Sequence, residues 1–321
     1  MSNDKLTSHS QDDASETTRI VESLKVLSRQ YARMVLLLDP FAGNHLLDTI
    51  DALPSPAHCV RLDDPLFKGD PQSAPLLVEL LSTEPSHQEL LAQSITRAQE
   101  QVRNPGAPHS VCAWLFTDVS LKRLQQAMRQ RLDARYPRGA RVYLRYFDPR
   151  VMPRLSVLLA PLTDAPTPLH SNLSQLFGPI RAWCHLNREG LLQRHDNPQP
   201  ENPAFGGFLR FDETTAAAID RVQAINLTAR ALTQGAIPCK QSDDAVIDTH
   251  LVQAQQLGLR DTSDLISYAW RAMHYGPAFV SDPMLPALIA QAATHGIPFD
   301  ALLESRVPPK SPFDGTSVST A

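Results

Sequence analysis

The chain has 321 residues and a mass of 35.5 kDa, a length that predicts about two domains. Hydrophobic residues make up 42% of it and charged residues 20%, which excludes a disordered chain and a membrane-embedded one, so we expect a soluble globular protein. The formal net charge is −4, yet the segment from Leu121 to Arg154 carries ten basic residues against two acidic ones, a local charge of +8.

Both ends of the chain are polar. Residues 1–19 lack the basic and apolar regions of a signal peptide and predict a disordered leader, and residues 306–321 predict a disordered tail. No apolar run approaches the roughly 18–20 residues of a membrane-spanning helix. The cysteines stand singly, without the close pairs of zinc or redox sites. We therefore expect a cytoplasmic protein without disulfides and without membrane insertion.

Residues 20–195 alternate strand and helix patterns and predict an α/β domain, with an α+β arrangement as the alternative. Short apolar runs predict buried strands, and apolar residues at helical spacing predict helices, most clearly in the segment that begins at Leu121. The predicted strands are 34–38, 58–62, 110–116, 141–147 and 180–186. The predicted helices are 75–81, 86–102, 121–136 and one that starts at Asp148.

The second half of the chain changes in composition. Asn, Pro and Gln dominate the beginning of residues 196–211, which predicts a linker. Residues 212–305 then predict a smaller, all-helical C-terminal lobe, with helices at 212–233, 244–257, 263–274 and 283–295. Gly258 and Gly296 stand where left-handed helix caps belong.

The sequence shows no recognisable catalytic or cofactor motif. It contains 27 Pro but only 13 Gly, and it lacks the nucleophile elbow, the phosphate-binding loop and the dinucleotide fingerprint. No His spacing is typical of a metal site, since His185 and His195 are too far apart to share a helix turn. We therefore expect no catalytic residue, no metal and no cofactor.

Two carboxylates leave an enzyme open as an alternative. Asp39 and Asp118 each follow a predicted strand, where α/β enzymes place catalytic carboxylates. The simpler interpretation is that they cap turns and helices. A hydrolase that uses Asp39 or Asp118 is the alternative function.

The basic segment allows two further interpretations. Arginines interspersed with tyrosines can bind nucleic acid, so the Arg block at 121–154 is a second alternative site. The acidic overall charge and the amphipathic pattern of the helix favour a solvated face instead. Arg145 differs, because it lies on an otherwise apolar strand, and we expect it to pair with Asp148.

Several motifs, in their order and spacing, resemble the domain-of-unknown-function 4123 family. The resemblance covers about residues 34–192, and the helical second half resembles the variable C-terminal region of such proteins. The segments that carry it are Val35–Asp39, Leu66–Gly69, Ala74–Val78, Trp114–Thr117, Tyr143–Val151 and Phe177–Trp183. The positions that match the family pattern, which we expect to be structural, are Arg145, Asp148, Pro149, Gly178 and Pro179.

The resemblance implies a non-enzymatic adaptor chaperone of bacterial type VI secretion. Such a protein binds and stabilises one toxic effector and helps to load it onto the VgrG spike. Its partners would then be the effector and VgrG, and no nucleic acid. The candidate partner-binding residues are Arg129, Arg138, Tyr268, Trp270, Met273 and Phe279, although the four in the helical lobe also fit its core.

Overall fold

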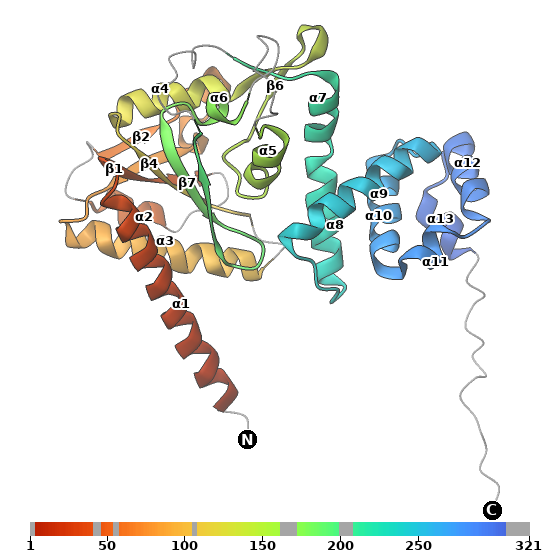
Figure 1. The fold of residues 1–321 in the computed structure, drawn as a ribbon, viewed down its shortest axis with the longest axis horizontal. Coiled ribbons are helices and arrows are strands. Elements are labelled where there is room, and N and C mark those ends of the chain that lie inside the picture. Colours follow the sequence, from red (N-terminus) through yellow and green to blue (C-terminus); the bar gives the residue numbers. More distant parts are fainter. Residues whose placement is uncertain are drawn as a thin grey trace, which may run out of the picture. The chain divides into compact units, whose positions relative to one another are not determined.

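The computed structural model describes residues 4–40, 46–53, 58–104, 108–160, 172–198 and 208–305 (Figure 1). The chain divides into two compact units between Ile219 and Asp220. The described part of the first unit combines sheets and helices, and that of the second contains helices. The expected fold class, a mixed domain followed by a smaller helical lobe, is confirmed.

Six strands form the large sheet of the first unit, in the order β2-β3-β1-β4-β7-β8. They are β1 (Arg33–Leu38), β2 (Cys59–Arg61), β3 (Leu76–Leu80), β4 (Val111–Thr117), β7 (Ile180–Leu186) and β8 (Leu192–Asp196). Every pairing in this sheet is antiparallel. The domain therefore takes the α+β form of the two that we considered, because a doubly wound α/β sheet is built from parallel strands.

The large sheet separates two cores, and side chains of its central strand β1 point alternately into each. Val35 and Leu37 contribute to one core, and Leu36 and Leu38 to the other, which is why the strand reads as an unbroken apolar run. The helices α1 (Asp4–Ser28), α2 (Leu46–Asp51) and α3 (Pro85–Arg103) supply the second core. The first core receives side chains from α4 (Leu121–Arg131), α5 (Met152–Leu158), α6 (Leu173–Phe177) and α7 (Glu213–Asp220). Figure 1 shows α3 and α4 on opposite sides of the sheet.

A small sheet corrects the predicted domain boundary. Its strands β5 (Asp133–Arg135), β6 (Arg141–Tyr143) and β9 (Leu209–Arg210) lie in the order β6-β5-β9, and β9 runs parallel to β5. Leu209 and Phe211 are buried in the core that contains Val35. The last residues of the predicted linker 196–211 thus belong to the first unit, which ends at Ile219. The burial of Leu209 and Phe211 stabilises this segment within the first unit, although the polar residues before it predict a linker.

The N-terminal prediction is also corrected. Helix α1 begins at Asp4, where we expected a disordered leader over residues 1–19. Its C-terminal half carries Ile20, Leu24 and Leu27, which are buried at helical spacing, and the Thr17 hydroxyl donates a 2.7 Å hydrogen bond to Gln99 on α3. The sequence of residues 1–19 predicts disorder because the buried apolar side chains of this helix begin only at Ile20. The predicted tail, 306–321, lies outside the described residues.

The predicted helix at 75–81 is wrong, because this segment is strand β3. Its five side chains are all buried, and it pairs with β1 on one side and β2 on the other. Even Glu79 is buried, where it forms an ion pair with Arg33. A short run buried on both faces shows neither helical nor strand periodicity, so length and neighbours decide its structure.

The strand predicted at 141–147 and the helix predicted from Asp148 are both shorter than expected. Strand β6 ends at Tyr143 and α5 begins at Met152, with turns between them. In these turns the Asp148 amide donates to the Arg145 carbonyl at 3.1 Å, and the Val151 amide donates to the Asp148 carbonyl at 2.9 Å. Two short 3-10 helices precede β3, η3 (Pro65–Phe67) and η4 (Pro71–Ser73), and a third, η5 (Pro137–Gly139), joins β5 to β6.

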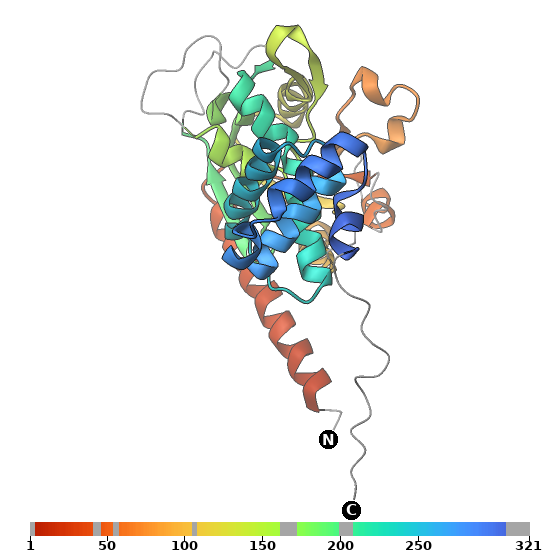
Figure 2. The same ribbon diagram turned by 90° about the vertical axis from the view of Figure 1, so that its right-hand side faces the viewer.

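The second unit is helical in its described residues (Figure 2). It contains α8 (Val222–Gln234), η7 (Gln241–Asp243), α9 (Asp244–Leu257), α10 (Thr262–Tyr275), α11 (Pro277–Val280), α12 (Leu285–His295) and α13 (Phe299–Glu304). The single helix predicted at 212–233 is two helices, α7 and α8. Gly258 and Gly296 adopt left-handed conformations with φ of 114° and 63°, as expected for helix caps. None of the helices described in either unit is long and apolar enough to cross a bilayer.

Candidate functional site

A network of charged side chains lies where β1 ends, beside the turns that precede α5. Asp39 follows β1 directly, is 3% exposed, and forms an ion pair with Arg145. Asp148 binds Arg150 through both oxygens, at 2.9 Å to Nε and 2.6 Å to Nη2, and it also accepts the Arg150 backbone amide at 2.9 Å. The predicted Arg145–Asp148 pair is therefore wrong. The fold brings Asp39 from a distant strand to Arg145, while Asp148 takes a near neighbour.

The ionisable groups around this network are held in fixed charge states. Burial alone would raise the pKa of Asp148, but hydrogen bonds and attraction from Arg150 outweigh it, so that pKa lies below its usual value. Burial, reinforced by the positive charge of Arg150, lowers the pKa of His109 to about 4. Burial, with Asp39 and Asp148 nearby, raises the pKa of the Cys112 thiol far above its usual value. At neutral pH the Asp148 carboxylate is ionised, the His109 imidazole is neutral and the Cys112 thiol is protonated.

This chemistry suits a structural role for the network. The Asp148 oxygens already accept hydrogen bonds, and Cys112 is buried in its thiol form, which is a poor nucleophile. Asp118, the other carboxylate considered for catalysis, accepts a 2.8 Å hydrogen bond from Arg181 and a 3.0 Å bond from the Ala32 amide. Asp39 and Asp118 thus tie strands and loops together. The hydrolase alternative stays a prediction without an observation that favours it.

Gly178 and Pro179 form a second structural cluster. Gly178 ends α6 with φ 57° and ψ −120°, and a Cβ atom there would lie 3.1 Å from Nη2 of Arg131. Arg131 is 2% exposed and donates to the carbonyls of Gln175 at 3.0 Å and Ala127 at 2.9 Å. The Pro179 carbonyl accepts the Thr117 hydroxyl at 2.8 Å. Glycine is favoured here because φ is positive and because a Cβ atom would press against the buried guanidinium.

Pro149 completes the set of family-motif positions. It is buried in the turn between Asp148 and Arg150. Its ring fixes φ and thereby restrains the turn that carries both members of that ion pair. The geometry of Arg145, Asp148, Pro149, Gly178 and Pro179 is consistent with the structural role that we expected from the motifs.

The basic segment divides into neutralised and free cations. Arg141 pairs with Asp133, and Arg135 lies 4.6 Å above the Phe208 ring. Arg129, a candidate partner-binding residue, is half-exposed and 3.9 Å from Asp64. Among the described residues of the basic segment, three exposed cations have side chains without a hydrogen bond or ion pair: Lys122, Arg123 and the other candidate, Arg138. Sequence reasoning counted these charges but could not separate the two groups.

The candidate residues of the helical lobe contribute to its core. Tyr268 is fully buried, and its ring packs 5.4 Å from that of Phe279. Trp270, Met273 and Phe279 are partly buried against the same core. A partner-binding role for the four stays a prediction. The sequence reasoning missed Tyr275, which is 56% exposed and contacts Trp270 and His274 at the end of α10, because it falls outside the apolar stripe.

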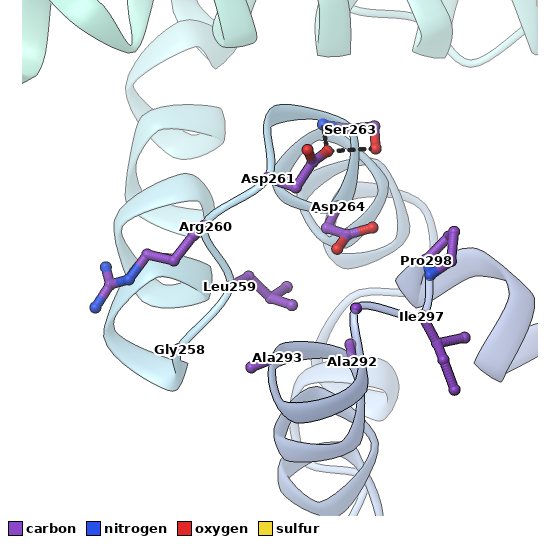
Figure 3. Close-up of a pocket in the computed structure, with 11 residues that line it drawn as sticks. Gly258, Leu259, Arg260, Asp261, Ser263, Asp264, Ala292, Ala293, Ile297 and Pro298 are labelled. Carbon is purple, nitrogen blue, oxygen red and sulfur yellow. Dashed lines mark hydrogen bonds between the residues drawn. The ribbon is translucent and has the colours of Figure 1, made fainter.

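A cavity of about 390 Å³ lies between the α9–α10 and α12–α13 turns (Figure 3). Its polar groups serve the fold. Asp261 accepts hydrogen bonds from the amide and hydroxyl of Ser263, at 2.8 and 2.6 Å, and so caps α10. Asp264 accepts the Phe299 amide at 2.9 Å and so holds the start of α13. These contacts explain the polar lining without a ligand.

The described residues contain no group of three or more His, Cys, Asp or Glu side chains arranged to hold a metal ion. His185 and His195, which are distant in sequence, stack at 5.2 Å because β7 and β8 are paired. Burial and the neighbouring His195 lower the pKa of His185 to about 3. Burial also lowers the pKa of His195, so both rings are neutral near pH 7.

Comparison with known proteins finds one domain family that matches part of the chain. The sequence model of the family DUF4123, a domain of unknown function, matches residues 35–162. The match supports the resemblance to this family and includes Arg145, Asp148 and Pro149. Gly178 and Pro179 lie beyond it, although the resemblance was expected to reach about residue 192. No curated protein and no solved structure matches the chain.

Proposed function

We propose that this protein is a non-enzymatic adaptor chaperone that binds and stabilises a cognate type VI secretion effector and helps to load it onto the VgrG spike. The observation that carries the proposal is the DUF4123 match over residues 35–162. We place the protein in the cytoplasm for this role, where it meets the effector before secretion.

The geometry of the matched domain agrees with a binding role. Asp39 and Asp148 hold arginines in ion pairs, Cys112 is a buried thiol, and the pKa of His109 keeps its ring neutral. These groups stabilise a scaffold and do not assemble a nucleophile with a base. The exposed cations of the same domain offer contacts to a protein partner.

The experiment is co-expression with the effector gene that neighbours this gene. We expect the effector to co-purify with this chain, and to be insoluble, unstable or unsecreted when this gene is deleted. An effector that remains soluble, stable and secreted without this chain contradicts the proposal. Asp39→Asn and Asp118→Asn variants, which remove the carboxylates of the hydrolase alternative, serve as controls and should still capture the effector.

A further inference from the structure

The outer face of α4 carries cations, and two of them have no acidic partner among the described residues. Leu121, Leu124 and Met128 are buried on the inner side of this helix, which fixes its rotation. The opposite side is exposed and consists of cations and amides only: Lys122, Arg123, Gln126, Arg129 and Gln130. Lys122 and Arg129 are two helical turns apart, about 10 Å, on the same line. Gln126 lies between them.

Two other helices of this unit, α1 and α3, pair cations with carboxylates on the same helix. Helix α1 has the pairs Glu16–Arg19 at 2.7 Å and Glu22–Lys25 at 3.1 Å, and α3 has Arg97–Glu100 at 3.2 Å. Helix α4 has no Asp or Glu, so such pairs cannot form within it. The side chains of Lys122 and Arg123 form no hydrogen bond or ion pair with any described residue; the Arg123 backbone amide is bonded to the N-cap Ser120.

The position of Lys122 and Arg123 also lowers the stability of helix α4. Lys122 and Arg123 lie in the first turn of α4, which contains no acidic residue. The positive end of the helix dipole disfavours cations there and favours carboxylates. Local stability therefore gives no reason for these charges, in contrast to the arginines at the C-terminal end of the same helix.

The charge of the rest of the protein favours one class of partner over another. Outside 121–154 the chain carries a net charge of −12, which repels a polyanion that extends beyond the cationic face. A nucleic acid is such an extended polyanion, whereas an acidic protein segment can place its carboxylates on α4 alone. Arg forks and Gln amides also match carboxylates in geometry.

We infer that the exposed face of α4, built from Lys122, Arg123 and Arg129, is the docking surface for an acidic, Asp- or Glu-rich segment of a protein partner. The identity of that partner as the effector or the spike rests on the proposed function. The cations then supply attraction and orientation during encounter, and binding weakens as salt rises.

Fluorescence anisotropy with labelled oligo-glutamate tests the inference directly. We expect saturable binding to the full chain, weaker binding of oligo-glutamine of the same length, and about a tenfold loss of oligo-glutamate affinity in the Lys122→Glu/Arg123→Glu variant. The matched control is Arg29→Glu/Arg230→Glu, which changes the net charge equally at exposed arginines elsewhere. Circular dichroism shows whether each variant is folded.

Three outcomes overturn the inference. They are an equal loss in both double variants, no saturable binding of oligo-glutamate, and tighter binding of single-stranded oligo-thymidylate than of oligo-glutamate, which would favour nucleic acid. Effector capture separates the two proposals. If the wild type captures the effector and Lys122→Glu/Arg123→Glu captures it equally, the docking surface is wrong and the proposed function stands. If the wild type captures none, the proposed function fails whatever oligo-glutamate shows.

Discussion

The two ends of the basic segment use the same kind of charge in opposite ways. In the turns before α5, Arg145 and Arg150 meet buried carboxylates, and in the middle Arg131 is enclosed by carbonyls. At the start of α4, the side chains of Lys122 and Arg123 are exposed and have no acceptor among the described residues. The density of cations is similar, so the difference lies in whether the fold delivers an acceptor. Variants that remove the acceptors of Arg145, Arg150 or Arg131 should therefore lose stability, whereas variants that remove Lys122 or Arg123 should not.

The largest effect is expected at Gly178, which makes room for Arg131. Gly178→Ala should lower the free energy of unfolding by about 3 kcal/mol, because its backbone conformation is strained for alanine and the new Cβ meets the buried guanidinium. Urea denaturation measures the change. The control is Gly190→Ala, which also has a positive φ but open space around it, and should cost about 1 kcal/mol. Equal losses would show that Arg131 does not constrain Gly178.

The ion pair formed by the buried carboxylate of Asp148 comes next. Asp148→Ala should cost about 2 kcal/mol, because the Arg150 guanidinium and amide lose a charged acceptor, partly replaced by water since Arg150 is half-exposed. The surface pair Arg194–Asp196 provides the comparison, and Asp196→Ala should cost less than about 0.5 kcal/mol. Similar values for the two variants, again from urea denaturation, would contradict the distinction between enclosed and free charges.

The pH dependence of stability tests the burial of His109, which lies near Asp148 and Arg150. The folded-state pKa of His109, about 4, lies below the unfolded value of about 6.5, so its contribution to stability is complete above about pH 6.5 and is lost as pH falls towards 4. Between about pH 7.5 and 5 the wild type should lose about 1–2 kcal/mol more than His109→Gln. His185 acts in the same direction in both proteins and cancels in the difference. Parallel pH profiles would refute the burial of His109.

The smallest effect, and one of opposite sign, is expected on α4. Lys122→Glu should raise the free energy of unfolding by about 0.5 kcal/mol, because it places an acidic residue in the first turn. Arg129→Glu should lower it by a similar amount, because Arg129 is in the last turn and lies near Asp64. Thermal melts of the two variants give the signs. A loss of stability in Lys122→Glu would mean that the fold does use this cation.

Much of the fold could be predicted from local patterns. The strands β1, β4 and β7 and the helices α3, α9 and α12 lie close to their predicted positions, because each has an apolar run or stripe long enough to reveal its period. Strand β3 was missed because the buried Glu79 interrupts its short apolar run. Helix α1 was missed because its apolar side chains begin only in its second half.

The candidate site was less accessible to sequence reasoning. The residues of the network were recognised, yet Arg145 was paired with its neighbour Asp148 because sequence distance is the only distance available there. Its partner Asp39 comes from a strand 106 residues away. Similarly, counting located the +8 segment, but only burial and ion pairs separate Lys122 and Arg123 from the neutralised arginines.

The antiparallel pair formed by β4 and β7 has a consequence for anyone who wishes to excise the family-matched region. A fragment of residues 35–162 lacks β7, and so leaves the edge of β4 bare and removes Trp183 from the core. It also lacks β9, which pairs with β5. Bare edges promote aggregation, so such a fragment should be insoluble. A fragment of residues 33–219 retains every described strand of both sheets. Here the segment recognised between relatives is shorter than the segment that folds.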